Sequence, residues 1–66
     1  MYNLFLNSEN EIFNYSEGAL KEYNSNFYIV KDDILVPKNI ISIIVQVETI
    51  PEDYEDGKYK YVNNKF

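Results

Sequence analysis

The fold of this chain is decided by residues 40–48, which read Ile40-Ile41-Ser42-Ile43-Ile44-Val45-Gln46-Val47-Glu48. Successive side chains of a strand point to opposite faces of a sheet, so the odd-numbered positions form one face that is wholly apolar and β-branched. The other face becomes polar toward Glu48. The pattern predicts a strand whose odd-numbered side chains lie in the core. The residues expected to be most buried in the protein are Ile41, Ile43, Val45, Val47, Leu4, Phe13, Leu20 and Ile29. Replacing Ile43 with Ala is expected to cost ~2–5 kcal/mol, which is most of the stability of so small a core.

The residues that follow are the expected partner of this strand. Residues 49–57 include Pro51 and Gly57 and are expected to be a loop, and residues 58–62 alternate Lys and Tyr. Pairing Glu48 with Lys58 gives compatible neighbours along the whole hairpin, and a slip of one residue would set Lys against Val. Asn63-Asn64 then predict a tight turn, after which the chain begins to return.

The outer edge of residues 58–62 is expected to be free, because only Lys65 and Phe66 follow the turn. A free strand edge can pair with a strand of a partner, so this edge is the expected docking element. The alternative is that Tyr2–Leu6 covers the edge and closes the sheet into a small barrel.

The N-terminal residues predict a first hairpin. Tyr2–Leu6 and residues 11–15 flank four turn-forming residues, Asn7-Ser8-Glu9-Asn10. Pairing Leu6 with Glu11 sets Leu4 opposite Phe13 and Tyr2 opposite Tyr15. Both faces of this hairpin carry apolar side chains, so we expect it to be covered on both sides.

A second hairpin is predicted between residues 27 and 37. Residues 27–30 and 34–36 are apolar strands that flank Lys31-Asp32-Asp33, and Asp tolerates the positive φ of a turn better than most residues. Pro37 lacks an amide proton, so the returning strand is expected to end there.

One short helix is expected near residues 17–23. Ser16 can cap it, and Glu17 suits its positive N-terminal end. At two turns, such a helix must pack on the sheet through Ala19, Leu20 and Tyr23. The predicted fold class is mainly β (α+β), a small antiparallel sheet or partly open barrel of hairpins with one short helix, in a single domain over residues 1–66.

The composition excludes several classes of function. The chain has 66 residues, no Cys, no His and a net charge of −5. Without Cys and His it has no disulfide, no thiolate metal site and no imidazole base. An acidic chain is not expected to bind nucleic acid or anionic membranes directly. No segment approaches the ~20 apolar residues of a membrane-spanning helix, and no basic N-terminal region indicates a signal peptide.

Catalysis and cofactor binding are not expected either. The acidic run from Glu48 to Asp56 is a poor match to a calcium loop, since Gly57 falls one position early when counted from Asp53. Ser16 has no neighbouring base to activate it. A chain of this length can hardly enclose a pocket for a small molecule. We therefore expect a protein that is not an enzyme and holds no cofactor or metal.

Tyrosines and carboxylates near the C-terminus are the candidate partner-binding residues. The seven Tyr exceed what a small core can bury with each hydroxyl paired. They are either amphipathic residues between core and surface or part of a protein–protein surface, where Tyr is enriched. The candidate set consists of Tyr54, Tyr59, Tyr61, Phe66, Glu52, Asp53, Glu55 and Asp56.

The C-terminal third also carries a resemblance. Val47-Glu48-Thr49-Ile50-Pro51-Glu52-Asp53-Tyr54, followed by Gly57-Lys58-Tyr59-Lys60-Tyr61-Val62-Asn63-Asn64-Lys65-Phe66, resembles short phage and prophage proteins of low-GC Gram-positive bacteria. Such proteins tend to be encoded near tail, fibre and lysis genes. The resemblance covers a strand, an acidic loop and a second strand, and it transfers no catalytic residue.

Two functions follow as hypotheses. The preferred one is a non-enzymatic structural or tail-associated accessory module that docks on other phage tail proteins or on copies of itself, in the virion or the host cytoplasm. The alternative is a small acidic phage-encoded inhibitor of a host defence or nucleic-acid-binding protein, which would present its carboxylates to a basic groove.

Overall fold

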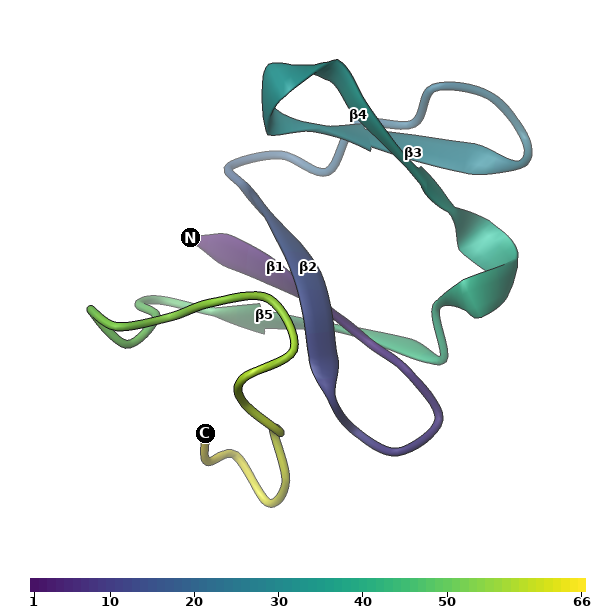
Figure 1. The fold of residues 1–66 in the computed structure, drawn as a ribbon. Helices are drawn as coiled ribbons and strands as arrows, with labels where there is room; N and C mark the ends of the chain where they lie inside the picture. Colours follow the sequence, from purple (N-terminus) through teal and green to yellow (C-terminus); the bar gives the residue numbers. More distant parts are fainter.

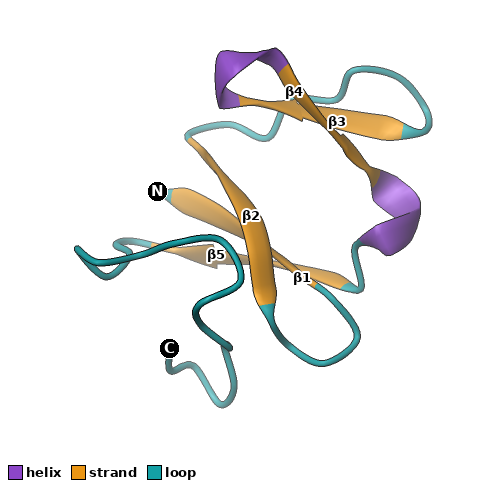
Figure 2. Cartoon of the chain, in the orientation of Figure 1, coloured by secondary structure: helices purple, strands orange, loops and turns teal.

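The structure is a computed structural model that describes residues 1–66. Five short strands make up most of its regular secondary structure. The strands are β1 (Tyr2–Leu6), β2 (Ile12–Glu17), β3 (Phe27–Val30), β4 (Ile34–Pro37) and β5 (Ile43–Val47). Two single 3-10 turns, η1 (Lys31–Asp33) and η2 (Lys38–Ile40), are the only helical segments (Figures 1 and 2). The strands form an antiparallel sheet of order β2-β1-β5 and a separate β3–β4 hairpin, which confirms a mainly β fold of small antiparallel sheets. No helix of the structure has the length and apolar composition needed to cross a bilayer.

Strand β1 lies at the centre of the molecule and is covered on both faces. Leu4 and Leu6 are buried on one face together with Ile12 of β2. Phe5 is buried on the other face, against Val30 and Val36 of the β3–β4 hairpin. The core therefore consists of two small clusters separated by β1, and the expectation that the first hairpin is covered on both sides is confirmed.

The first hairpin forms with a different register from the predicted one. Leu4 lies opposite Tyr15 rather than Phe13, and a β-bulge interrupts the pairing between Phe5 and Leu6. The loop explains the difference. Asn7 and Glu11 close it through a backbone hydrogen bond, whereas the prediction closed it with Leu6 and Glu11. The Asn7 side-chain oxygen accepts hydrogen bonds from the amides of Glu9 and Glu11, and its amide group donates to the Glu11 carboxylate.

The helix predicted over residues 17–23 is absent. Ser16 and Glu17 continue β2 instead, and Gly18 has a φ of +81°, outside the helical region. The Ser16 oxygen, which would have capped the helix, accepts a hydrogen bond from the side chain of Asn3. The loop beyond Gly18 runs beside β3, where the Ile29 amide donates to the carbonyl of Lys21.

Strand β5 pairs with β1 and not with residues 58–62, so the predicted C-terminal hairpin is wrong. Val45 lies opposite Leu4 and Val47 opposite Tyr2, in a register without a bulge. Because β1 is apolar on both faces, it offers β5 more buried contact than the alternating Lys and Tyr residues could.

The position of β5 at an edge also changes which residues are buried. Of the eight residues predicted to be most buried, only Leu4 is. Ile43 is 51% exposed, and the remaining six are half-buried. The buried apolar residues that the prediction missed are Phe5, Leu6, Ile12, Val30 and Val36.

Residues 57–61 lie along the start of β2, on the side away from β1. The Ile12 amide donates to the carbonyl of Tyr59 at 2.9 Å, and the amides of Gly57 and Tyr61 donate to Ile12 and Asn10. The predicted alternative, in which Tyr2–Leu6 covers this segment and closes a barrel, is therefore also wrong. Across the molecule the order is residues 57–61, β2, β1, β5.

Two turns agree with the sequence. The β3–β4 hairpin forms over the predicted residues, with Asp32 and Asp33 at positive φ, and β4 ends at Pro37. Asn63 and Asn64 also have positive φ, and the backbones of Val62 and Lys65 exchange two hydrogen bonds across them.

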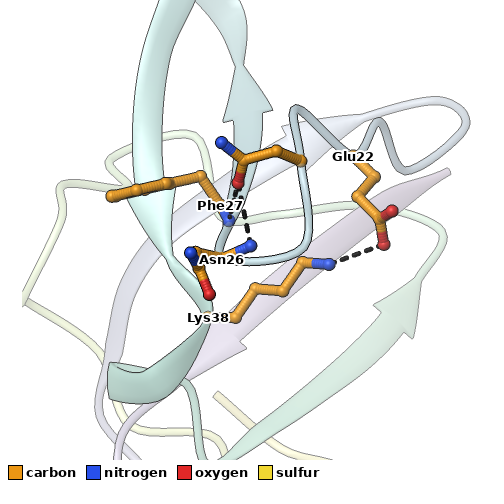
Figure 3. Close-up of polar contacts among 5 residues, drawn as sticks. Glu22, Asn26, Phe27 and Lys38 are labelled. Atoms are coloured by element: carbon orange, nitrogen blue, oxygen red, sulfur yellow. Dashed lines mark hydrogen bonds and ion pairs between the residues drawn. The ribbon is translucent and has the colours of Figure 1, made fainter.

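Side-chain contacts anchor the loop before β3 (Figure 3). The side-chain oxygen of Asn24 accepts hydrogen bonds from the amides of Asn26 and Phe27, at 2.8 and 3.0 Å. The Lys38 ammonium at the start of η2 lies 2.6 Å from the Glu22 carboxylate. These contacts connect the loop to η2, on the side of the molecule away from the candidate partner-binding residues.

Candidate functional site

Six aromatic rings contact one another in a continuous series, which we call the aromatic row. The row runs through Tyr2, Tyr15, Tyr54, Tyr59, Phe66 and Tyr61. Consecutive ring centroids are 5.1–6.5 Å apart; most pairs meet edge to face, and Tyr54 and Tyr59 stack nearly parallel. These distances and angles are the ones that aromatic pairs prefer.

The loop from residue 48 to 57 brings the row together. Two successive turns, closed by the Tyr54 amide on Pro51 and the Lys58 amide on Glu55, fold the loop back over β2. Gly57 then takes a φ of +83°, a conformation that side chains disfavour, and donates its amide to Ile12. The loop thereby sets Tyr54 against Tyr15 on β2.

The row is anchored in the core on its inner side. Tyr15, Tyr54, Tyr59 and Tyr61 are half-buried and pack against the cluster of Leu4, Leu6 and Ile12. Phe66 is 41% exposed and lies between Tyr59 and Tyr61. The row therefore presents a surface whose rings are held in place by the sheet beneath them.

Carboxylates and lysines fix several of the hydroxyls. The Tyr59 hydroxyl donates to one oxygen of Asp53 at 2.6 Å, and the Lys58 ammonium binds the other at 2.9 Å. The Tyr54 hydroxyl donates to Asp56 at 2.8 Å. On β2, the Tyr15 hydroxyl accepts a hydrogen bond from the Lys31 ammonium at 2.8 Å, and the same ammonium lies over the Tyr15 ring.

These contacts shift several pKa values. The hydrogen bond from Tyr59, followed by that from Lys58, lowers the pKa of Asp53 below its usual 3.8. The same carboxylate raises the pKa of the Tyr59 hydroxyl and of Lys58. Burial, together with the hydrogen bond to Asp56, raises the pKa of Tyr54 far above its usual value. The hydroxyls of Tyr54 and Tyr59 therefore remain protonated donors across the neutral range.

The structure brings six of the eight candidate residues into this one surface: Tyr54, Tyr59, Tyr61, Phe66, Asp53 and Asp56. Glu52 and Glu55 lie on the same loop, exposed and without a side-chain partner. The sequence-based prediction did not include β2 in this surface, because it paired the strand after the loop with residues 40–48. The pairing of Tyr2 with Tyr15 in the first predicted hairpin was the one signal for the other end of the row.

One polar recess lies between β2 and η1. It has a volume of about 360 Å³, and its polar wall includes Glu17, Lys21, Lys31 and Asp32. Ser16 also borders it, and its oxygen is bound by Asn3. No group of three or more His, Cys, Asp or Glu side chains is arranged to hold a metal ion.

No protein-family model, curated protein or solved structure matches this chain.

Proposed function

We propose that this protein is a non-catalytic docking module that binds another protein through the aromatic row. The observation that carries the proposal is the row itself, six rings in mutual contact, with Tyr54 and Tyr59 fixed by carboxylates. Aromatic side chains that are already held in place lose little conformational entropy on binding. They are therefore the residue type that most often supplies binding energy at protein interfaces.

The charges around the row indicate the chemistry of the partner. Asp53 and Asp56 border the rings, and Glu52 and Glu55 remain without an internal partner. The chain as a whole has a net charge of −5. A complementary surface combines an apolar centre, which receives the rings, with Lys or Arg side chains at its rim.

The resemblance of residues 47–54 and 57–66 to small phage proteins suggests the setting. In that setting the partner is another protein of the tail, fibre or baseplate region, and the module works in the virion or in the host cytoplasm. The alternative, an acidic inhibitor of a nucleic-acid-binding protein, needs freely presented carboxylates. Asp53 is occupied by Lys58 and Tyr59, and Asp56 by Tyr54, which leaves only Glu52 and Glu55 of the four candidate carboxylates for a basic groove and favours docking through the rings.

Affinity capture with matched variants tests the proposal. The immobilised protein is compared with Phe66→Ala, which removes an exposed ring of the row, and with Tyr23→Ala, which removes a 57% exposed ring outside it. We expect capture of a phage tail protein by the parent and by Tyr23→Ala. Phe66→Ala is expected to weaken binding of that protein by about fivefold or more, the effect of losing an interface anchor.

Two other outcomes count against docking through the row. Equal capture by all three proteins would show that the row is not the binding surface. Recovery of a nucleic-acid-binding protein that is insensitive to Phe66→Ala and is released by high salt would favour the inhibitor instead.

A further inference from the structure

Strand β5 has an open outer edge. Its only strand partner is β1, and no other backbone hydrogen bond in the protein involves residues 43–47. At the opposite side of the sheet, residues 57–61 cover the start of the β2 edge, at Ile12 and the preceding Asn10, through three backbone hydrogen bonds. The three-stranded sheet is thus covered at the start of its β2 edge and open along the whole of its β5 edge (Figure 1).

Nothing in β5 opposes pairing with a further strand. Proteins usually protect an edge with a charged residue, a proline or a bulge. Residues 43–47 read Ile-Ile-Val-Gln-Val, contain none of these, and pair with β1 in an unbroken register. Strand β4 differs, because it follows two Asp residues at positive φ and ends at Pro37.

We propose that β5 of a second copy of this chain pairs with this edge, antiparallel and across a two-fold axis at Val45. In this register Ile43 lies opposite Val47 of the other copy, Ile44 lies opposite Gln46, and Val45 lies opposite itself. The two contacting surfaces are the same, as a two-fold dimer requires. Pairing satisfies the outward backbone groups of both strands and covers part of Ile43, which is 51% exposed in the single chain.

Charge distribution favours a second copy as the occupant. The pairing places no like charges opposite each other, because the nearest acid, Glu48, lies opposite Ser42 of the other copy. The two Glu48 side chains are then six residues apart along the strands, about 20 Å. This distance exceeds the ~8 Å over which charges interact at physiological salt. Repulsion between two chains of net charge −5 is therefore expected to weaken the dimer mainly at low salt.

The size of the contact sets the expected strength of the dimer. Edge pairing of two five-residue strands covers much less surface than the ~1,200–2,000 Å² of a stable interface. We therefore expect a monomer–dimer equilibrium that depends on protein concentration. The inference does not rest on the aromatic row, whose rings lie over the face of the sheet that carries Leu4 and Leu6.

Sedimentation equilibrium with two lysine variants tests the dimer. Ile43→Lys puts a charge on the open edge, and Ile34→Lys makes the same change at a 48% exposed position on β4. We expect the parent to shift from the 7.9 kDa monomer toward twice that mass as concentration rises, and more readily at higher salt. Ile43→Lys is expected to weaken the dimer about tenfold or more, and Ile34→Lys to leave it within about twofold.

Cysteine cross-linking tests the register and does not depend on the lysine variants. Since the chain contains no Cys, a single Val45→Cys introduces one thiol at the two-fold axis. Each of two opposed thiols loses its proton and one electron to an added mild oxidant, diamide, and the sulfurs join in a disulfide between copies. Ile43→Cys places its two thiols about four residues apart, too far for a disulfide. We expect Val45→Cys to cross-link and Ile43→Cys to remain largely uncross-linked.

A parent that stays monomeric up to about 1 mM has no self-pairing edge, and its β5 is then available to a strand of a different protein. A dimer that responds equally to Ile43→Lys and Ile34→Lys uses another surface. Equal cross-linking of the two cysteine variants would show that the strands do not pair in this register. None of these results bears on capture through the aromatic row, so the two proposals can fail separately.

Discussion

Asn3 is a buried polar residue on β1, the central strand, and its side chain connects all three strands of the sheet. Its amide group donates to the Ser16 hydroxyl at 3.1 Å and to the Gly18 carbonyl at 2.8 Å, on the β2 side. Its oxygen accepts from the Gln46 side chain of β5 at 3.3 Å. A buried polar group with several partners favours the one register that satisfies them all.

Removing the Asn3 side chain should therefore reduce the free energy of unfolding by more than the size of the side chain suggests. We expect Asn3→Ala to lower the free energy of unfolding by ~1–3 kcal/mol, because Ser16 and the Gly18 carbonyl lose a buried partner. The control is Asn39→Ala, an exposed residue without side-chain hydrogen bonds, which is expected to change stability by less than ~0.5 kcal/mol. Urea unfolding of the two variants measures the difference, and equal stabilities would show that the Asn3 contacts are not formed in solution.

Asp53 gives the acidic loop a defined dependence on pH. Its pKa is lowered in the folded protein, so above its usual pKa of 3.8 the carboxylate is ionised in both states and its contacts contribute fully to stability. As pH falls below 3.8 the unfolded chain takes up the proton first, and the contribution is lost as pH passes the folded pKa. Acid should therefore loosen the contact of the loop with Tyr59 and Lys58.

Thermal unfolding of Asp53→Asn across the acidic range tests this dependence. We expect a lower Tm than the parent at pH 7, and a difference that closes as pH falls through the lowered pKa of Asp53. Glu55→Gln, at an exposed and unpaired carboxylate of the same loop, serves as the control and should leave the Tm at pH 7 close to that of the parent. A constant difference between Asp53→Asn and the parent at every pH would contradict the role of the ionised carboxylate.

At the scale of elements, local turn chemistry was predicted well, and the partners of distant strands were not. Asp32-Asp33 and Asn63-Asn64 form turns as expected because these residue types tolerate positive φ wherever they occur. The pairing of β5 depends instead on competition between two compatible partners. The predicted pairing of residues 40–48 with residues 58–62 gave compatible side-chain neighbours at every position. Strand β1, however, is apolar on both faces and buries more of β5.

The same competition explains the missing helix and the partly predicted site. Ser16 is a good helix cap in isolation, yet its oxygen is used by Asn3, a residue 13 positions earlier. The aromatic and acidic residues of the loop were identified from composition, since Tyr and carboxylates are recognisable without knowing the fold. Their contact with Tyr15 and Lys31 follows from the position of residues 57–61 beside β2, which the sequence pattern did not indicate.

The difference between a central and an edge strand can be measured directly. Leu4→Ala, on β1, is expected to cost ~2–5 kcal/mol, because Leu4 is fully buried. Ile43→Ala, on β5, is expected to cost less than about 1.5 kcal/mol, because half of the side chain is already exposed. Urea unfolding of both variants under the same conditions is the test. A larger loss for Ile43→Ala would restore the prediction that residues 40–48 form the centre of the core.

At the scale of the whole molecule, stability is divided between two faces of one strand. Eight of the 66 residues are buried, and the apolar ones fall into two clusters of three on opposite sides of β1. Neither cluster is large enough to stand alone, so both depend on β1 remaining in place. The aromatic row lies over the face of the sheet that carries Leu4 and Leu6, whereas the proposed pairing uses the outer backbone edge of β5, so the two proposed interactions use different surfaces.

The position of β1 between β2 and β5 also has a consequence for the order of folding. Its pairing with β2 closes a short loop, whereas its pairing with β5 closes the long loop between Leu6 and Ile43. Closing the longer loop costs more entropy, so we expect β5 to join after the transition state, when the β1–β2 hairpin is already formed. Stopped-flow kinetics with Ile12→Val and Ile44→Val tests this order: the first should mainly slow folding, and the second should mainly speed unfolding. If Ile44→Val slowed folding as much as Ile12→Val, the long-range pairing would belong to the nucleus, and the sheet would assemble in a single concerted step.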